Sequence, residues 1–66
     1  MDNWFPIPGY EGVYWITKSG RVRNAKGHVL TPVGNETIGY KVELRNNGQR
    51  SRVFVSDLLV KTFGGM

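Results

Sequence analysis

Positive charge is concentrated on both sides of an Asn-Gly pair in the stretch RNNGQRSR, residues 45–52. An Asn-Gly pair between alternating apolar residues is the strongest short-range signal for a β-hairpin with a two-residue turn. Such a turn sets Arg45 directly opposite Arg50, and a like-charged pair there costs on the order of a few tenths of a kcal/mol. Guanidinium groups bind phosphate oxygens through paired hydrogen bonds, so phosphate binding would offset this cost. A solvated tip, with its charges screened by salt, is the competing interpretation.

The rest of the hairpin follows from the position of this turn, because strand side chains alternate between two faces. The expected pairs on the buried face are Leu44 with Ser51, Val42 with Val53 and Tyr40 with Val55. The opposite face pairs Glu43 favourably with Arg52 and collects the cations Lys41, Arg45, Arg50 and Arg52. A ribbon with one basic face resembles the β-ribbons that enter a DNA groove and contact phosphates or base edges.

No set of residues in the sequence has the types and spacing of an active site. His28 stands alone beside an expected turn, there is no Cys, and no acidic cluster has metal-ligand spacing. Ser56 and Asp57 are adjacent at an expected helix start, which is capping geometry rather than a nucleophile beside its base. Gly9 and Gly12 lack the third glycine and the Lys-Ser/Thr pair of a phosphate loop. We therefore expect no catalysis, no bound metal and no cofactor.

The overall composition restricts the classes of partner. The chain has 66 residues, with nine Lys and Arg against five Asp and Glu, giving a formal net charge of +4 and a pI near 9.9. A chain of this length forms one domain, residues 1–66, and its basic charge favours polyanionic partners. The absence of Cys fits a reducing compartment, and the sequence has neither a signal-peptide pattern nor an apolar run of membrane-spanning length. We expect a cytoplasmic monomer.

Short apolar alternations separated by glycine-containing turns predict an antiparallel meander of three strands before the hairpin. The expected strands are 13–17 and 21–24, with a third around Leu30. Three-residue loops that end in glycine place Ile16, Val22 and Leu30 in one apolar row. On the other face Trp15 falls opposite Arg23, where a cation–π contact can form, although we expect Trp15 to belong to the core.

Two further segments complete the expected fold. Segment 33–39 is polar and rich in glycine, so we expect a loop that connects two sheets. A short helix is expected over 56–63, with Ser56 as its N-cap, Asp57 in the first turn and Gly64 just beyond its end. Its core-facing stripe is expected to contain Leu59, Val60 and Phe63. The predicted fold class is α+β and mainly β, with a three-stranded antiparallel meander, a β-hairpin and one short C-terminal helix packed on the sheet.

The motifs along the chain occur in a distinctive order. Trp4 precedes the run IPGYEG (7–12) and Tyr14, which are followed by GRVR (20–23). Further along come GHVLTP (27–32), GYKVEL (39–44) and VFVSDLLVKTF (53–63). Over essentially the whole chain, this series resembles the nuclease-associated modular DNA-binding motif, of the NUMOD class, found at the start of phage homing endonucleases of the HNH type.

The resemblance implies a β-module that grips duplex DNA away from the cleavage site. In such endonucleases the metal-binding and hydrolytic residues lie beyond the helix that 58–63 resembles, so the resemblance implies that this chain is non-catalytic. It implies either the front module of a longer nuclease or a small free-standing relative. Where the family commonly has His-Arg, this chain has Ser56-Asp57, which removes a basic residue from the helix start.

Two functions are carried forward from the sequence. The first is a non-catalytic module for double-stranded DNA, with Arg21, Arg23, Lys26, Lys41, Arg45, Arg50 and Arg52 as the expected cationic contacts. Asn46, Asn47 and Gln49 at the hairpin tip are expected to hydrogen-bond bases or phosphates. The alternative is a phage or prophage accessory domain that binds a protein instead of DNA, with Trp4 or Trp15 as an exposed aromatic anchor.

Overall fold

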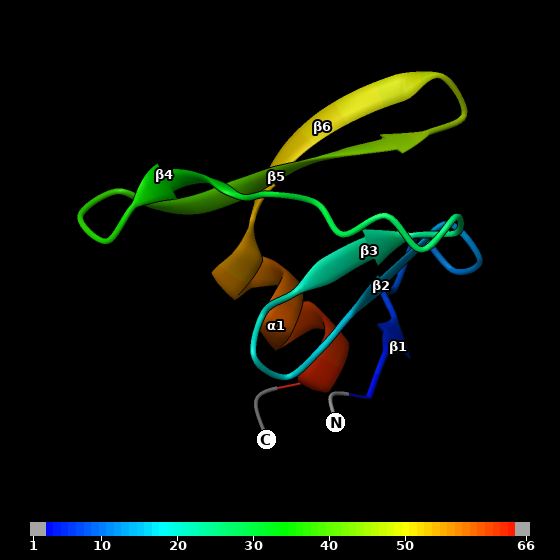
Figure 1. Cartoon of the computed structure of the whole chain (residues 1–66), viewed down its shortest axis with the longest axis horizontal. Helices are drawn as coiled ribbons and strands as arrows, with labels where there is room; N and C mark the ends of the chain where they lie inside the picture. Colours follow the sequence, from blue (N-terminus) through cyan, green and yellow to red (C-terminus); the bar gives the residue numbers. More distant parts are fainter. Residues whose placement is uncertain (1–2, 65–66) are drawn as a thin grey trace.

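The chain folds as two small antiparallel sheets followed by one helix (Figure 1). The structure, a computed structural model, describes residues 3–64. Sheet A has the strand order β1-β2-β3 and sheet B the order β4-β5-β6. The bounds are β1 Phe5–Pro6, β2 Tyr14–Ile16, β3 Val22–Asn24, β4 Val33–Asn35, β5 Gly39–Asn46, β6 Gln49–Phe54 and α1 Val55–Phe63. The expected mainly-β class, with one short C-terminal helix, is confirmed.

Sheet A keeps the expected register but takes a different third strand. Ile16 pairs with Val22 and Trp15 with Arg23, as the three-residue loop predicted. The segment around Leu30 makes only an isolated bridge between Val29 and Arg23, and it is not a strand. Pro32 follows closely and has no N–H for further pairing, which limits any strand there. The third strand is instead β1, which pairs with the other edge of β2.

The β5–β6 hairpin has the predicted turn and register. Asn47 and Gly48 have φ angles of 54° and 80°, the left-handed values that a two-residue type I′ turn requires. The pairs Leu44 with Ser51, Val42 with Val53, Glu43 with Arg52 and Arg45 with Arg50 are all formed. The expected pair of Tyr40 with Val55 is wrong, because α1 begins at Val55 and Tyr40 pairs with Gly34 of β4.

Segment 33–39 is not a loop throughout, because its first residues form β4 on the edge of β5. Gly34 makes this pairing possible, since a Cβ at this position would overlap the carbonyl oxygen of Gly39. The following turn is held by Asn35, whose Oδ1 accepts hydrogen bonds from the N–H groups of Thr37 and Ile38 at 2.9 Å each. The glycine that suggested a loop is therefore the residue that allows the strand.

Helix α1 begins two residues earlier than a helix capped by Ser56 would. Its N-cap is Phe54, without a capping side-chain hydrogen bond, so the prediction of Ser56 as N-cap is wrong. Gly64 ends the helix with φ at 69° and donates its N–H to the carbonyl oxygen of Val60 at 2.7 Å, as predicted. Within residues 3–64 there is no helix of the length and apolarity needed to cross a membrane.

The apolar stripe of α1 also differs from the expected one. Leu58 is buried, whereas Val60, expected to face the core, is 64% exposed. The half-buried or buried positions are Val55, Leu58, Leu59, Thr62 and Phe63, which follow the helical spacing i, i+3, i+4, i+7, i+8 from the first residue. Leu59 and Phe63 therefore pack as predicted, and Val60 does not.

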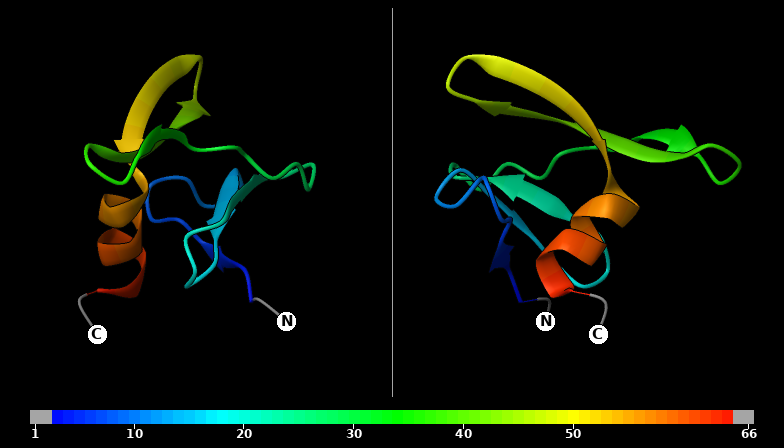
Figure 2. Two further views of the ribbon diagram at one scale, coloured as in Figure 1. Left: turned by 60° about the vertical axis from the view of Figure 1, so that its left-hand side comes forward. Right: turned by 180° about the vertical axis from the view of Figure 1, so that it is seen from behind.

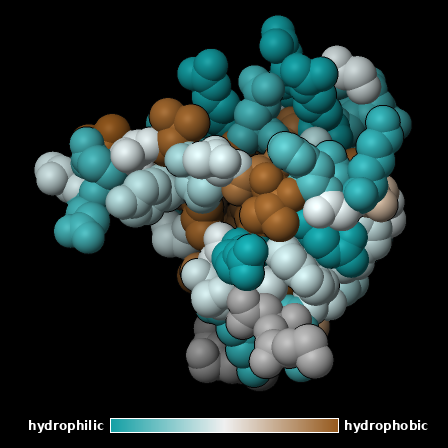
Figure 3. Space-filling model, viewed as in Figure 1, coloured by the Kyte–Doolittle hydropathy of each residue, from teal (hydrophilic) through white to brown (hydrophobic). Residues whose placement is uncertain are grey.

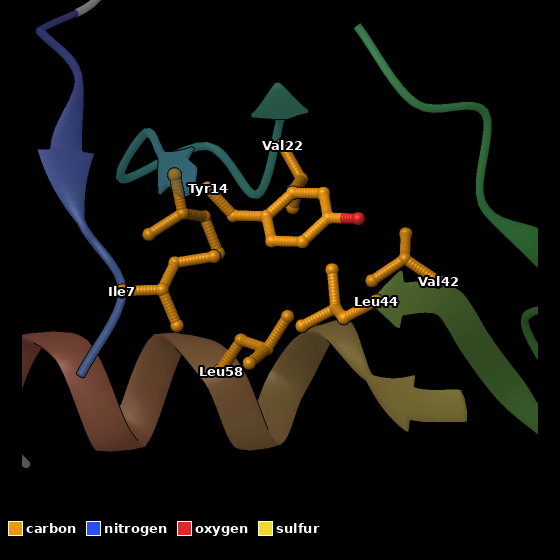
Figure 4. Packing of buried hydrophobic residues seen from close by; sticks show 7 residues of the cluster. Ile7, Tyr14, Val22, Val42, Leu44 and Leu58 are labelled. Carbon is orange, nitrogen blue, oxygen red and sulfur yellow. The ribbon is translucent and has the colours of Figure 1, made fainter. Parts of the chain in front are cut away.

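The core lies between the two sheets and is closed by α1 (Figure 4). Its buried members are Ile7, Tyr14, Ile16, Val22, Val42, Leu44 and Leu58. Figure 2 shows sheet B across one end of the helix and sheet A beside it, so the two sheets turn their inner faces toward a common centre. Their outer faces consequently point in different directions.

Two hydrogen bonds attach the hairpin to the sheet A part of the fold. The Tyr14 hydroxyl accepts the backbone N–H of Arg45 at 3.0 Å, and the Asn46 side chain donates to the Gly9 carbonyl at 3.1 Å. In a two-residue hairpin Arg45 and Arg50 form a non-hydrogen-bonded pair, so the Arg45 N–H points to the open edge of β5. Tyr14, with its ring in the core, supplies the acceptor for this N–H.

Replacing Tyr14 with Phe should lower the free energy of unfolding by about 1 kcal/mol, because the part-buried Arg45 N–H loses its acceptor. Urea denaturation followed by circular dichroism measures the change. Tyr40→Phe removes a hydroxyl from a side chain that is 45% exposed and should change stability by less than about 0.5 kcal/mol. Equal losses in the two variants would contradict the assigned role of the Tyr14 hydroxyl.

Candidate nucleic-acid interface

The outer face of the β5–β6 hairpin carries a cluster of basic side chains. Residues of β5 alternate between the buried Val42 and Leu44 and outward positions, and the pairing with β6 aligns the outward positions of both strands. The result, here called the basic face, contains Lys41, Glu43, Arg45, Arg50 and Arg52. All five are exposed. In Figure 3 the hydrophilic side chains gather along the upper edge, where Figure 1 places the hairpin.

The like-charged pair at the tip end of the basic face is only partly compensated. The Arg45 Nη2 lies 3.7 Å from the Glu43 Oε2, and both side chains are well exposed, so this ion pair contributes little to stability. Arg45 and Arg50 oppose each other at a non-hydrogen-bonded position, where side chains come closest. With one carboxylate among four cations, the basic face carries a formal net charge of +3.

The β4 end of the basic face has a different character. The Lys41 ammonium lies 4.7 Å from the centroid of the Phe54 ring, its partner across the strands. Next to it, Val33 and Ile38 are 75% and 67% exposed and line a shallow hollow bordered by Lys41 and Arg52. Figure 3 shows apolar surface toward this end of sheet B. Sequence reasoning missed these two residues because it assigned 33–39 to a loop.

Arg23, one of the expected DNA contacts, is held by aromatic rings on sheet A. Its guanidinium carbon lies 4.5 Å from the centroid of Trp15 and 5.2 Å from that of Trp4, and Nη1 donates to the Asn24 carbonyl at 3.1 Å. The cation–π contact with Trp15, which the register allowed but which was not the favoured interpretation, is formed. The expectation that Trp15 belongs to the core is wrong, because Trp15 is only half-buried beneath this contact.

Arg21 and Lys26 lie in the sheet A part of the fold, away from the basic face. Both are exposed; Arg21 comes just before β3 and Lys26 comes shortly after it. The Arg21 N–H donates to the Thr17 hydroxyl at 3.1 Å, and the Lys26 N–H donates to Asn24 Oδ1 at 3.0 Å. Because the outer faces of the sheets point in different directions, the structure divides the nominated cations between two surfaces.

The polar residues at the hairpin tip have separate positions. Asn46 is half-buried, and its amide is engaged with the Gly9 carbonyl. Asn47 occupies the left-handed turn position, and Gln49 closes the turn opposite Asn46. Asn47 and Gln49 are exposed and remain at the surface of the tip. Within the part of the chain that the structure describes, no group of three or more His, Cys, Asp and Glu side chains could hold a metal ion.

The comparisons with known proteins give one family. The model of the NUMOD4 motif matches residues 2–52. The matched segment ends at Arg52, so it contains every cation of the basic face and stops before α1. Neither a curated protein nor a solved structure matches the chain with significance.

Replacing Arg23 with Met should destabilise the fold by about 1 kcal/mol, because a cation leaves the faces of two Trp rings. The Trp fluorescence spectrum should change at the same time, since the surroundings of both rings change. Urea denaturation and emission spectra of the folded protein measure these effects. Lys26→Met is the matched control. It should change the free energy of unfolding by less than about 0.5 kcal/mol and leave the Trp emission spectrum unchanged. An unchanged spectrum for Arg23→Met would contradict the stacked arrangement.

Proposed function

Because the chain belongs to the NUMOD4 motif family, we propose that it is a non-catalytic module that binds double-stranded DNA through the basic face of sheet B. The NUMOD4 motif is non-catalytic and is associated with DNA-binding modules of endonucleases. The observation that carries the proposal for this chain is the register of the hairpin, which aligns four cations on one exposed face.

The shape of the hairpin suits a duplex. A two-stranded β-ribbon fits the major groove, which is about 12 Å wide. Side chains on the same face of a strand repeat about every 6.8 Å, so long cationic side chains on two strands can reach several phosphates. A phosphate placed between Arg45 and Arg50 turns their mutual repulsion into attraction. This supports phosphate binding as the reason for an otherwise unfavourable pair.

Preorganisation of the hairpin also supports this role. The tip is tied to the rest of the fold through Arg45 and Asn46, so the basic face is fixed in the free protein. Binding then requires little ordering of the backbone, which lowers the entropic cost of association. We assign the DNA contacts to Lys41, Arg45, Arg50 and Arg52, with Asn47 and Gln49 at the tip. Arg23 is assigned to the fold, and Asn46 to docking the hairpin.

The proposed biological setting follows the family. We propose that the module acts as a monomer in the cytoplasm, as part of or beside an HNH-type homing endonuclease of phage or prophage origin. In this setting the module supplies affinity for the duplex, and cleavage depends on residues other than those of the basic face.

A protein-interaction module is the second candidate, and the exposure of Val33 and Ile38 favours it. The aromatic anchors expected from the sequence support it less, because Trp4 and Trp15 are stacked on Arg23. The two candidates differ in the effect of salt. Binding through apolar contacts changes little with ionic strength, whereas binding to phosphates weakens steeply.

Fluorescence anisotropy with a labelled duplex of mixed sequence should show salt-dependent binding. About four phosphate contacts correspond to a log–log slope near −3.6, at ~0.9 per contact. Arg45→Glu/Arg50→Glu should weaken binding by more than about tenfold at low salt and make the slope shallower by about 1.8. Lys18→Glu/Lys26→Glu makes the same change in net charge on the loops beside β3 and should affect binding much less. Equal losses in both double variants would indicate a general charge effect and refute a specific basic face.

A single substitution separates stability from binding at the like-charged pair. Arg50→Thr removes the repulsion with Arg45 and introduces a residue that favours strands. The free energy of unfolding should therefore rise by a few tenths of a kcal/mol. Affinity for the duplex should nevertheless fall severalfold, because one phosphate contact is lost. Urea denaturation and anisotropy on the same preparation provide both values. A variant that loses stability and keeps its affinity would show that Arg50 serves the fold.

A further inference from the structure

We infer that Val33 and Ile38, which lie beside the basic face, form an apolar contact for thymine methyl groups. The module would then bind a duplex more tightly when thymine occupies the positions next to that face. This inference rests on the proposed function, because it concerns a part of the same surface to which the DNA-binding proposal assigns no role. The two side chains are 75% and 67% exposed, and they line one hollow instead of being scattered singly over the surface.

The two residues act together because they line the same hollow on sheet B. Val33 pairs with Lys41 across β4 and β5, so it lies on the same face as the cations. Ile38 reaches the hollow from the turn after β4. Gly34 and Gly39 also line the hollow and bring no side chain into it. The apolar surface is therefore accessible to a small group that approaches the sheet.

Hydrogen bonds hold the backbone at both residues before any ligand arrives. The ladder between β4 and β5 fixes the backbone of Val33. The Asn35 side chain accepts the N–H of Ile38 at 2.9 Å and so fixes the turn that presents it. A rigid apolar contact loses little entropy on binding, which distinguishes it from a flexible loop.

The border of the hollow indicates the chemistry of its occupant. Lys41 and Arg52 lie at its edge, and Glu43, which is drawn toward Arg45, is the acidic residue that also lines it. An occupant that is apolar at its centre and anionic on its flanks fits this pattern. In the major groove, the C5 methyl of thymine is the apolar group on the base edges, and phosphates border it on both sides.

A protein partner fits these observations less well. A specific protein interface usually buries more than about 1,000 Å² around a cluster of apolar or aromatic anchors. The hollow offers the exposed side chains of Val33 and Ile38, with the buried Val42 also in its lining, and it is bordered by charged residues. It suits a single methyl group, or two neighbouring ones, better than it suits a large complementary surface.

The test compares duplexes that differ only in thymine methyl groups. Anisotropy titrations use the full chain with thymine-rich duplexes of mixed sequence and with the same duplexes carrying uracil in place of thymine. Uracil keeps the charge and the hydrogen-bonding edges, so the difference reports the methyl groups alone. We expect the wild-type chain to bind the thymine duplex at least about threefold more tightly, the effect of one well-buried methyl group.

Substitutions assign the preference to the hollow. Val33→Ser/Ile38→Ser should bring the affinity ratio of thymine to uracil duplexes close to one and leave the salt dependence unchanged. Val60→Ser is the matched control, because Val60 is equally exposed, at 64%, but lies on α1, and the ratio should stay as in the wild type. Circular dichroism verifies that each variant is folded.

The outcomes separate this inference from the proposed function. Salt-dependent binding with equal affinity for thymine and uracil duplexes would overturn the thymine contact and leave the DNA-binding proposal standing. The absence of salt-dependent binding to every duplex would overturn the proposed function, and the thymine contact with it. A wild-type chain that dimerises in sedimentation velocity, and a Ser double variant that does not, would identify the hollow as an interface between two copies and overturn the thymine contact.

Discussion

The arrangement of the two sheets depends on Tyr14, whose side chain joins them. Its ring is buried among residues of both sheets and of α1, and its hydroxyl satisfies the N–H of Arg45 on the open edge of β5. A domain of this size has few other means of fixing two small sheets, since it contains no disulfide. Together with the bond from Asn46 to the Gly9 carbonyl, this side chain sets the orientation of the hairpin, and with it the direction of the basic face.

The hairpin could be predicted from sequence because its information is local. Asn47 and Gly48 specify the turn, and the two-residue period of the strands then fixes every pair as far as Val53. The same reasoning failed at β4 and at α1. Gly34 signalled a loop, although it allows a close approach of two strands, and Ser56 suggested a cap, although tertiary packing extends the helix to Val55. These elements are set by contacts with distant residues.

The candidate interface divides in the same way. The cations of β5 and β6 could be assigned to one face, because alternation along paired strands is visible in the sequence. The surroundings of Arg23 depend in addition on Trp4, which comes from a distant part of the chain. Val33 and Ile38 were missed because the exposure of an edge strand, and of the turn that follows it, depends on which distant residues cover them. Each of the two apolar residues directly precedes a glycine, Gly34 or Gly39. This pattern is the sequence signal from which they could have been identified.

The opposed Arg45 and Arg50 give ionic strength two contrary effects on this molecule. Added salt screens their repulsion, so it slightly favours the folded hairpin when the protein is free. The same salt competes with the protein for the phosphates of the proposed complex. High salt is therefore expected to favour the free hairpin slightly and to weaken the proposed complex. In dilute buffer the repulsion between the two arginines is greatest, and so is the free energy that a bound phosphate would gain from them.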